Sequence, residues 1–220
     1  TKGVDIKEMI GKAIGEPLVK YLNDNKIGKF TSVKVINDTV ASLFAGLSNP
    51  GYDAQIGLIV GTGTNMATFV PTSKIEKLNP GYTQGGLISI NLESGNFNPP
   101  HVTEVDNKVD LKSDIPGAQR FEKAVSGMYL GEILKAKFPN TEFENKFDAQ
   151  KLTHIISYPD IHKEEYVNAA RCIYKRSAYL VAASLAGLIK ELIEQNDTIK
   201  KICLTAEGSL VWSEDRKGTN

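Results

Sequence analysis

Hydrophobic residues recur every three or four positions in four segments of this chain, and that spacing predicts helices with one buried face. The segments are 5–25, 37–47, 117–138 and 164–195. Pro17 lies inside the first segment, where it is expected to break or kink the helix. The last segment is apolar along most of one side, so it is expected to form the longest helix.

Shorter runs of apolar or alternating residues predict strands at 30–36, 55–60, 66–70, 87–92 and 200–205. Between the second and third runs, the small residues of 61–65 predict a tight turn, which would make these two strands an antiparallel hairpin. A further turn is expected at 207–209, and the polar segments 96–116 and 139–163 are interpreted as connections. Strands and helices in this order indicate an α/β protein.

Composition and charge exclude several classes of protein. Lysine and arginine number 26, and so do aspartate and glutamate, so the basic excess typical of a nucleic-acid-binding protein is missing. Hydrophobic residues make up 41% of the 220 positions, which argues against disorder. The longest apolar stretch, 179–189, is far shorter than the roughly 20 residues that cross a bilayer. We also find no signal peptide, and we expect a cytoplasmic protein that binds neither nucleic acid nor membrane.

The cysteines and histidines predict no metal site. Cys172 and Cys203 lie far apart in apolar surroundings and are interpreted as buried, reduced thiols. His101, His154 and His162 have no metal-ligand spacing, so we expect them in loops or at the surface.

Three groups of polar residues could carry chemistry, and each has an ordinary structural alternative. Asp38 stands where a strand is expected to end and a helix to begin, so it could cap the helix or take a proton from a hydroxyl. The turn 61–65 could be a simple hairpin turn, or its N–H groups and threonine hydroxyls could hold phosphate oxygens. Glu93 and Glu122 could be solvated carboxylates or acceptors for the hydroxyls of a sugar.

Four motifs in a fixed order resemble the hexokinases of eukaryotic type. They occupy residues 35–40, 56–65, 90–97 and 116–132. The resemblance extends over nearly the whole chain, from Thr1-Lys2-Gly3 to Glu207-Gly208-Ser209, and it is weakest over 138–163.

The resemblance implies an actin-like ATPase fold of the ribonuclease H-like class, with two lobes that close over sugar and ATP. Residues 1–28 would be the tail of the small lobe and a connecting helix, and residues 29–220 the large domain of a hexokinase, incomplete at both ends. The implied activity is ATP-dependent phosphorylation of a hexose, with glucose as the expected substrate, at the 6-hydroxyl and with Mg²⁺. The family's first phosphate loop, of the Asp-Leu-Gly-Gly-Thr type, does not occur in this sequence, which begins at Thr1 rather than Met. We therefore expect this chain alone to be inactive.

The family's site residues carry over by motif. Asp38 would be the general base on the 6-hydroxyl. The residues that would bind the sugar are Asn37, Asn65, Glu93 and Glu122, with Gln119 in support. The residues that would bind ATP are Gly61, Thr62 and Gly63 in the second phosphate loop, and Gly208 and Ser209 in the turn beside the adenosine. Thr1 and Lys2 resemble a pair that lies at the sugar and its transferring phosphate.

The sequence departs from the family pattern at three places. Ser94 replaces a usual Trp, Asn98-Pro99 replaces a usual Gly-Asp, and Thr205 replaces a usual Gly near the adenosine turn. The departures at Ser94 and Thr205 keep one alternative open, a hexokinase-like sensor that binds sugar without turnover. A second alternative is another sugar or acid kinase of the same superfamily.

Overall fold

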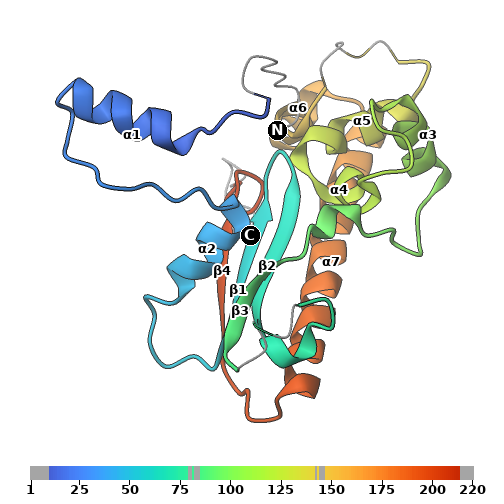
Figure 1. Cartoon of the computed structure of the whole chain (residues 1–220). Helices are drawn as coiled ribbons and strands as arrows, with labels where there is room; N and C mark the ends of the chain where they lie inside the picture. The colour runs from blue at the N-terminus through green and yellow to red at the C-terminus, as the bar shows by residue number, and fades with distance from the viewer. Residues whose placement is uncertain (1–9, 79–80, 82–84, 142, 144–146, 214–220) are drawn as a thin grey trace. The chain divides into compact units, whose positions relative to one another are not determined.

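The computed structural model describes residues 10–78, 81, 85–141, 143 and 147–213 (Figure 1). The chain forms two compact units, Thr1–Asn37 and Asp38–Asn220. The expected assignment of residues 1–28 to a small lobe and 29–220 to a large domain stays a prediction.

The smaller unit contains the helix α1 (Gly15–Asp24). The sequence predicts a helix over 5–25; residues 5–9 lie outside the described residues, and residues 10–14 are not helical. Pro17 falls in the first turn of α1, where a backbone N–H has no intrahelical acceptor to lose. The expected break or kink at Pro17 is therefore wrong.

The strand predicted at 30–36 is also wrong, because the structure gives that segment no strand. Val35 is 72% exposed and Ile36 is 53% exposed. Alternating residues hold a strand only where a neighbouring strand pairs with its backbone groups. Here the side chain of Asn23 bonds instead to both the nitrogen and the oxygen of Phe30, each at 2.8 Å.

The larger unit is built on a four-stranded sheet in the order β3-β2-β1-β4 (Figure 1). Its strands are β1 (Ala54–Val60), β2 (Thr64–Pro71), β3 (Leu87–Asn91) and β4 (Ile202–Glu207). β1 pairs antiparallel with β2 and β2 antiparallel with β3, so the predicted hairpin is confirmed. β4 pairs parallel with β1, and the carboxyl ends of these two strands therefore lie side by side. β4 ends later than predicted, which shortens the predicted turn at 207–209.

Helices cover both faces of the sheet. They are α2 (Asp38–Gly46), α3 (Glu104–Lys112), α4 (Arg120–Val125), α5 (Gly127–Lys137), α6 (Ala149–Ser157) and α7 (Glu164–Gln195). α7 matches its predicted range, and its residues Val181 and Leu192 pack on the face of β1 that carries Leu58 and Ile56. On the other face, α2 approaches β1 so closely that a Cβ on Gly57 would lie 2.6 Å from the oxygen of Thr39.

Two predicted connections contain helices. α3 lies within 96–116, and its start is fixed by a capping box in which the side chains and backbone of Thr103 and Asp106 bond to each other. α6 lies within 139–163, followed by the short 3-10 helix η5 (Pro159–Ile161). α3 has few apolar residues and no clear hydrophobic periodicity, so the sequence pattern missed it. α6 does have apolar residues at helical spacing, namely Ala149, Leu152, Ile155 and Ile156, but they lie within a segment that is polar as a whole, which favours a connection.

The helix predicted over 117–138 is interrupted at Ser126, which separates α4 from α5 with extended backbone angles. The reason lies outside the helix. The backbone nitrogen of Gly127 donates to the oxygen of Gly61, at the end of β1, with a length of 2.7 Å. This long-range bond uses a donor that a continuous helix would pair internally.

The cysteine prediction is correct for one residue. Cys203 in β4 is buried and free, whereas Cys172 is free but exposed on the outer side of α7, which corrects the expectation of two buried thiols. His154 and His162 lie near the surface on α6 and after η5, and His101 is exposed. The described residues contain no group of three or more His, Cys, Asp or Glu side chains that could hold a metal ion. No helix within the described ranges is both long and apolar enough to cross a membrane.

Candidate functional site

The turn after β1 meets the turn after β4 through two glycines. Gly208 has a φ of +118°, and a Cβ there would lie 2.3 Å from the oxygen of Val60. A Cβ on Gly61 would lie 3.4 Å from the Cα of Gly208. Glycine is required at 208 for both its conformation and its close approach. The ends of the two parallel strands are thus pressed together, at the edge where open α/β sheets bind ligands.

A cavity of about 850 Å³ lies beside these two turns. Its wall includes Gly61 and Thr62 from the first turn and Ser209 from the second, and it is completed by residues of α5, α6 and α7. Tyr174 of α7 is held in the wall, because its hydroxyl donates to the oxygen of Ala149 at 2.8 Å and contacts the Thr153 hydroxyl at 2.6 Å. Burial raises the pKa of Tyr174, which keeps the hydroxyl neutral. The volume falls in the range of small-molecule sites.

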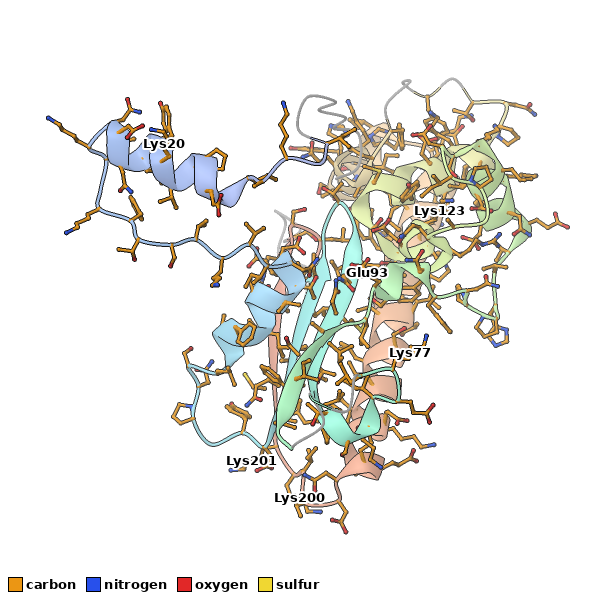
Figure 2. The ribbon with its side chains drawn as sticks, viewed as in Figure 1. Lys20, Lys77, Glu93, Lys123, Lys200 and Lys201 are labelled. Carbon is orange, nitrogen blue, oxygen red and sulfur yellow. The ribbon has the colours of Figure 1, made fainter. Side chains whose placement is uncertain are left out.

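Three polar side chains next to β2 and β3 form one chain of hydrogen bonds. Asn65 accepts from the backbone nitrogen of Ser94 at 3.1 Å and donates to Asn91 at 2.6 Å. Asn91 donates in turn to Glu93 at 2.6 Å. Asn65 and Glu93, both predicted from the sequence, are therefore connected through Asn91, which the sequence reasoning missed. Figure 2 shows Glu93 beside the strands, on the side of α4.

Glu122 connects α4 to the start of β2. Its Oε2 accepts from the backbone nitrogen of Thr64 at 3.0 Å, and the residue is only 5% exposed. Gln119 packs closely against the short 3-10 helix η4 (Ser94–Asn96). A Cβ on Gly95 of η4 would lie 2.5 Å from Oε1 of Gln119. Gln119, Glu122 and the end of β3 thus form one connected cluster with Thr64 and Asn65.

Two residues of this cluster have left-handed backbone conformations. Glu93 has a φ of +49° and Gln119 a φ of +53°, and the only other non-glycine residue with positive φ in the described part of the chain is Lys26. Such conformations cost about 1–3 kcal/mol each and are concentrated at functional sites. Sequence analysis selected Glu93 and Gln119 without reference to their conformation.

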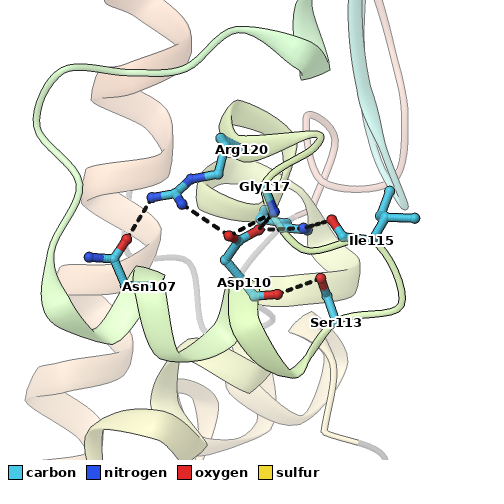
Figure 3. A network of polar contacts seen from close by, with 7 residues as sticks. Asn107, Asp110, Ser113, Ile115, Gly117 and Arg120 are labelled. Atoms are coloured by element: carbon cyan, nitrogen blue, oxygen red, sulfur yellow. Dashed lines mark hydrogen bonds and ion pairs between the residues drawn. The ribbon is translucent and has the colours of Figure 1, made fainter.

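α4 is held in place by a buried carboxylate of α3 (Figure 3). Asp110 bonds to the ammonium of Lys123 at 2.5 Å, to the guanidinium of Arg120 at 3.0 Å, and to the backbone nitrogen of Gly117 at 3.0 and 3.1 Å. Burial alone would raise the pKa of Asp110, but the hydrogen bond from Lys123, with Gly117 and Arg120, outweighs it and lowers the pKa. Removing one member of such a buried group typically costs about 3–5 kcal/mol.

Asp38 is the first residue of α2 and is exposed. Its Oδ1 accepts from the backbone nitrogen of Thr39 at 2.8 Å and contacts the Thr39 hydroxyl at 3.3 Å. One oxygen of Asp38 therefore binds a backbone N–H group in the first turn of α2. This capping contact does not prevent the carboxylate from also taking a proton from a hydroxyl.

The structure groups most of the predicted site residues. Asn65, Glu93, Gln119 and Glu122 are linked by the contacts above, while Gly61, Thr62 and Ser209 line the cavity. Gly63 accepts from the nitrogen of Gly61 at 2.9 Å within the turn. Asn37 is the last residue of the smaller unit. Thr1 and Lys2 lie outside the described residues.

Comparison with known proteins identifies relatives. The family model described as hexokinase matches residues 55–141. Hexokinase-2 of Oryza sativa subsp. japonica is 32% identical over 192 residues, which are 86% of this chain and 38% of that protein. Hexokinase-1 of Arabidopsis thaliana is 29% identical, with coverage of 96% and 50%. The chain spans at most about half the length of these curated relatives.

Solved structures have the same fold. A hexokinase from Schistosoma mansoni complexed with glucose aligns with a TM-score of 0.68 and 27% identity, over 89% of this chain and 52% of that one. A second hexokinase crystal structure aligns with a TM-score of 0.66 and 24% identity, over 89% and 49%. The predicted α/β class is confirmed as a mixed α/β fold like that of hexokinases. From the family match, the relatives and the shared fold, we conclude that this chain belongs to the hexokinase family.

Proposed function

We propose that the protein containing this chain transfers the γ-phosphoryl group of ATP to the 6-hydroxyl of a hexose, with glucose as the preferred candidate. The proposal rests on one observation: the predicted sugar-binding residues lie next to the predicted phosphate-binding turn. The polar cluster of Asn65, Glu93, Gln119 and Glu122 adjoins the glycine turn 61–63, and that turn lines the cavity. Phosphoryl transfer needs its two substrates held side by side more than it needs covalent chemistry.

The sugar would be bound by the polar cluster. Carboxylates and amides there can accept from or donate to the hydroxyls of a hexose, and the connected cluster would orient them. Asn37, next to Asp38 in the chain, is proposed as a further ligand, and so are Thr1 and Lys2. A hexose lacking one hydroxyl would leave an acceptor unpaired, which gives strong discrimination.

Asp38 is proposed as the general base. Its carboxylate would accept the proton of the 6-hydroxyl as that oxygen attacks the γ-phosphorus, and the bond from the γ-phosphorus to the bridging oxygen of ADP would break. The products are the hexose 6-phosphate and ADP, with the proton on Asp38. One oxygen of Asp38 accepts from Thr39, which fixes the orientation of the carboxylate.

ATP would be bound in the cavity, with its phosphates at the first turn. Gly61, Thr62 and Gly63 are proposed to contact the phosphates, and Gly208 and Ser209 the adenosine. The fit is supported by the backbone: a side chain at Gly208 would collide with Val60, so the two turns come close enough to share one ligand. Mg²⁺, which hexokinases use with ATP, would neutralise charge on the phosphates when bound.

The sugar-sensor alternative rests on the departures at Ser94 and Thr205. Thr205 does not line the cavity, and its hydroxyl would lie 2.8 Å from a Cβ on Gly46, so its side chain points toward α2. Ser94 bonds to Asn65 through its backbone, which any residue could supply. Neither departure therefore gives the sensor structural support.

The test is hexose-dependent formation of ADP by the full-length protein. We expect turnover with glucose and related hexoses but not with acetate. Sugar binding without ADP formation would favour the sensor, and turnover of acetate alone would favour another kinase of the superfamily. We also propose that residues 1–220 alone are inactive, since their sequence lacks the family's first phosphate loop, of the Asp-Leu-Gly-Gly-Thr type. The free thiols of Cys172 and Cys203 support the cytoplasm as the proposed location.

A further inference from the structure

α4 and Gln119, the residue before it, carry two kinds of side chain. Gln119 and Glu122 contact the end of the sheet and η4, whereas Arg120 and Lys123 contact Asp110 of α3. Glu122 and Lys123 are neighbours in the chain, so their side chains leave the helix about 100° apart. Rotation or displacement of α4 would therefore move Glu122 whenever it moved Lys123.

Nothing within α4 is sufficient to fix its position. The helix has six residues, Arg120–Val125, and no side chain caps its start. Helices this short are unstable unless tertiary contacts hold them. The residue that precedes it, Gln119, is left-handed, and Gly117 before that has a φ of +82°. The segment that presents Gln119 and Glu122 therefore depends on contacts from outside.

Some of those contacts come from the core packing of Phe121, Ala124 and Val125. Asp110 supplies others, at three positions that alternate along the chain with Gln119 and Glu122. It bonds to the backbone of residue 117, the side chain of residue 120 and the side chain of residue 123. Lys123 also donates to the oxygen of Ile115 at 2.7 Å, which ties the loop to the helix (Figure 3). Asp110 is 4% exposed and is the carboxylate that balances both cations.

We infer that Asp110, acting through Lys123, is a positioning residue that sets the geometry of Gln119 and Glu122 toward the hexose. The inference rests on the proposed function for its consequence in catalysis. Its structural part, the control of Glu122 by Asp110, can be measured independently, because the backbone N–H of Thr64 donates to Glu122. That N–H reports directly on where Glu122 lies.

The first experiment measures amide hydrogen exchange in the Asp110→Asn variant of the full-length protein. Asparagine retains the size and one acceptor of Asp110 but leaves Arg120 and Lys123 without their balancing charge. We expect protection at Thr64 to fall about tenfold more than protection at Leu58, a buried residue of the neighbouring strand. An equal loss at both amides would overturn the inference. Lys123→Met provides a second variant with the same expected result.

Asp53→Asn is the control for the same chemical change elsewhere in the larger unit. Asp53 is exposed and accepts backbone N–H groups from Lys200 and Lys201, at 2.8 Å each, at the opposite end of β1 and β4. Figure 2 shows Lys200 and Lys201 far along the sheet from Glu93. We expect this variant to lose no protection at Thr64 beyond that at Leu58. A selective loss at Thr64 in the control would mean that the Thr64 amide reports general destabilisation, and would overturn the inference.

The second experiment is a double-mutant cycle in the full-length enzyme. Asp110→Asn is expected to raise the KM for glucose about tenfold while the KM for ATP changes less than twofold. In the Glu122→Gln background the same change should raise the glucose KM less than twofold, because its effect passes through Glu122. Additive effects would overturn the inference. If the wild-type protein phosphorylates no hexose, the proposed function fails, and the exchange experiment still decides on Asp110.

Discussion

The backbone nitrogen of Thr64 lies 3.0 Å from a carboxylate oxygen of Glu122, a residue 58 positions away in the chain. This bond joins the first residue of β2 to α4, and both groups are buried. It places a buried carboxyl group at the end of the hairpin, beside the turn 61–63. The sheet, the glycine turn and the proposed sugar ligands therefore meet at one point.

Replacing Glu122 with Ala should affect both stability and sugar binding. The buried N–H of Thr64 would lose its acceptor, which costs about 1–3 kcal/mol of unfolding free energy. The affinity for glucose should fall at least tenfold, since a proposed ligand is removed. Urea denaturation and glucose titration of the full-length protein measure the two effects. Glu191→Ala, at an exposed site on α7, is the control, and equal glucose affinity in both variants would refute the role of Glu122.

Gly208→Ala should weaken ATP binding more than glucose binding. The new Cβ would lie 2.3 Å from the oxygen of Val60 at a φ of +118°, so the turns after β1 and β4 must separate. We expect the KM for ATP to rise about tenfold. Gly187→Ala is a matched control, because nothing lies within 4 Å of its Cβ on α7. That control should be more stable by about 0.5–1 kcal/mol. An unchanged ATP KM in Gly208→Ala would contradict the proposed nucleotide site.

Acid should destabilise the larger unit through Asp106. Burial alone would raise the pKa of Asp106, but hydrogen bonds from Arg176 and Thr103 outweigh it and lower the pKa. Because the folded pKa lies below the unfolded value of about 3.9, the stabilisation is complete above that value. It is lost as the pH falls through the folded pKa. Denaturation measured from pH 5 down to pH 2 should show a smaller loss of stability in Asp106→Asn than in the wild type. The same pH slope in variant and wild type would exclude this contribution.

His162 should give a separate loss of stability at mildly acidic pH. Burial and the nearby ring of His154 lower the pKa of His162, and the two ring nitrogens are 3.2 Å apart. As the pH falls below the unfolded value of about 6.5, the unfolded chain binds the proton before the folded one, so stability declines. His154→Gln should reduce that decline between pH 7 and 5, whereas His101→Gln should not. A decline of unchanged size in His154→Gln would contradict the prediction.

Local sequence signals predicted the elements that depend on local interactions. The hairpin around 61–65 and the long helix α7 formed where periodicity and glycines indicated. The segment 30–36 alternates like a strand, but alternation cannot supply a pairing neighbour. α3 has a recognisable start at Thr103 and Asp106, a capping signal that hydrophobic spacing does not detect.

The sequence predicted several residues of the candidate site, but not the residues that hold them in place. Family motifs selected Asn65, Glu93 and Glu122, which the structure connects. Asn91 lies inside the motif 90–97, but its bond to Asn65 joins residues 26 positions apart, which no local pattern predicts. Asp110 lies outside the four motifs, and its partners are 7 to 13 positions away. The interruption at Ser126 has the same origin, because it depends on a bond from Gly127 to Gly61.

The most direct test of the account is Asp38→Ala in the full-length protein, with glucose binding and ADP formation measured on the same sample. Asp38 is exposed at the start of α2, so its removal should cost no more than a helix cap, about 1 kcal/mol. We predict that glucose still binds while ADP formation falls at least a thousandfold. Turnover within tenfold of the wild type would contradict Asp38 as the base and, with it, the proposed mechanism.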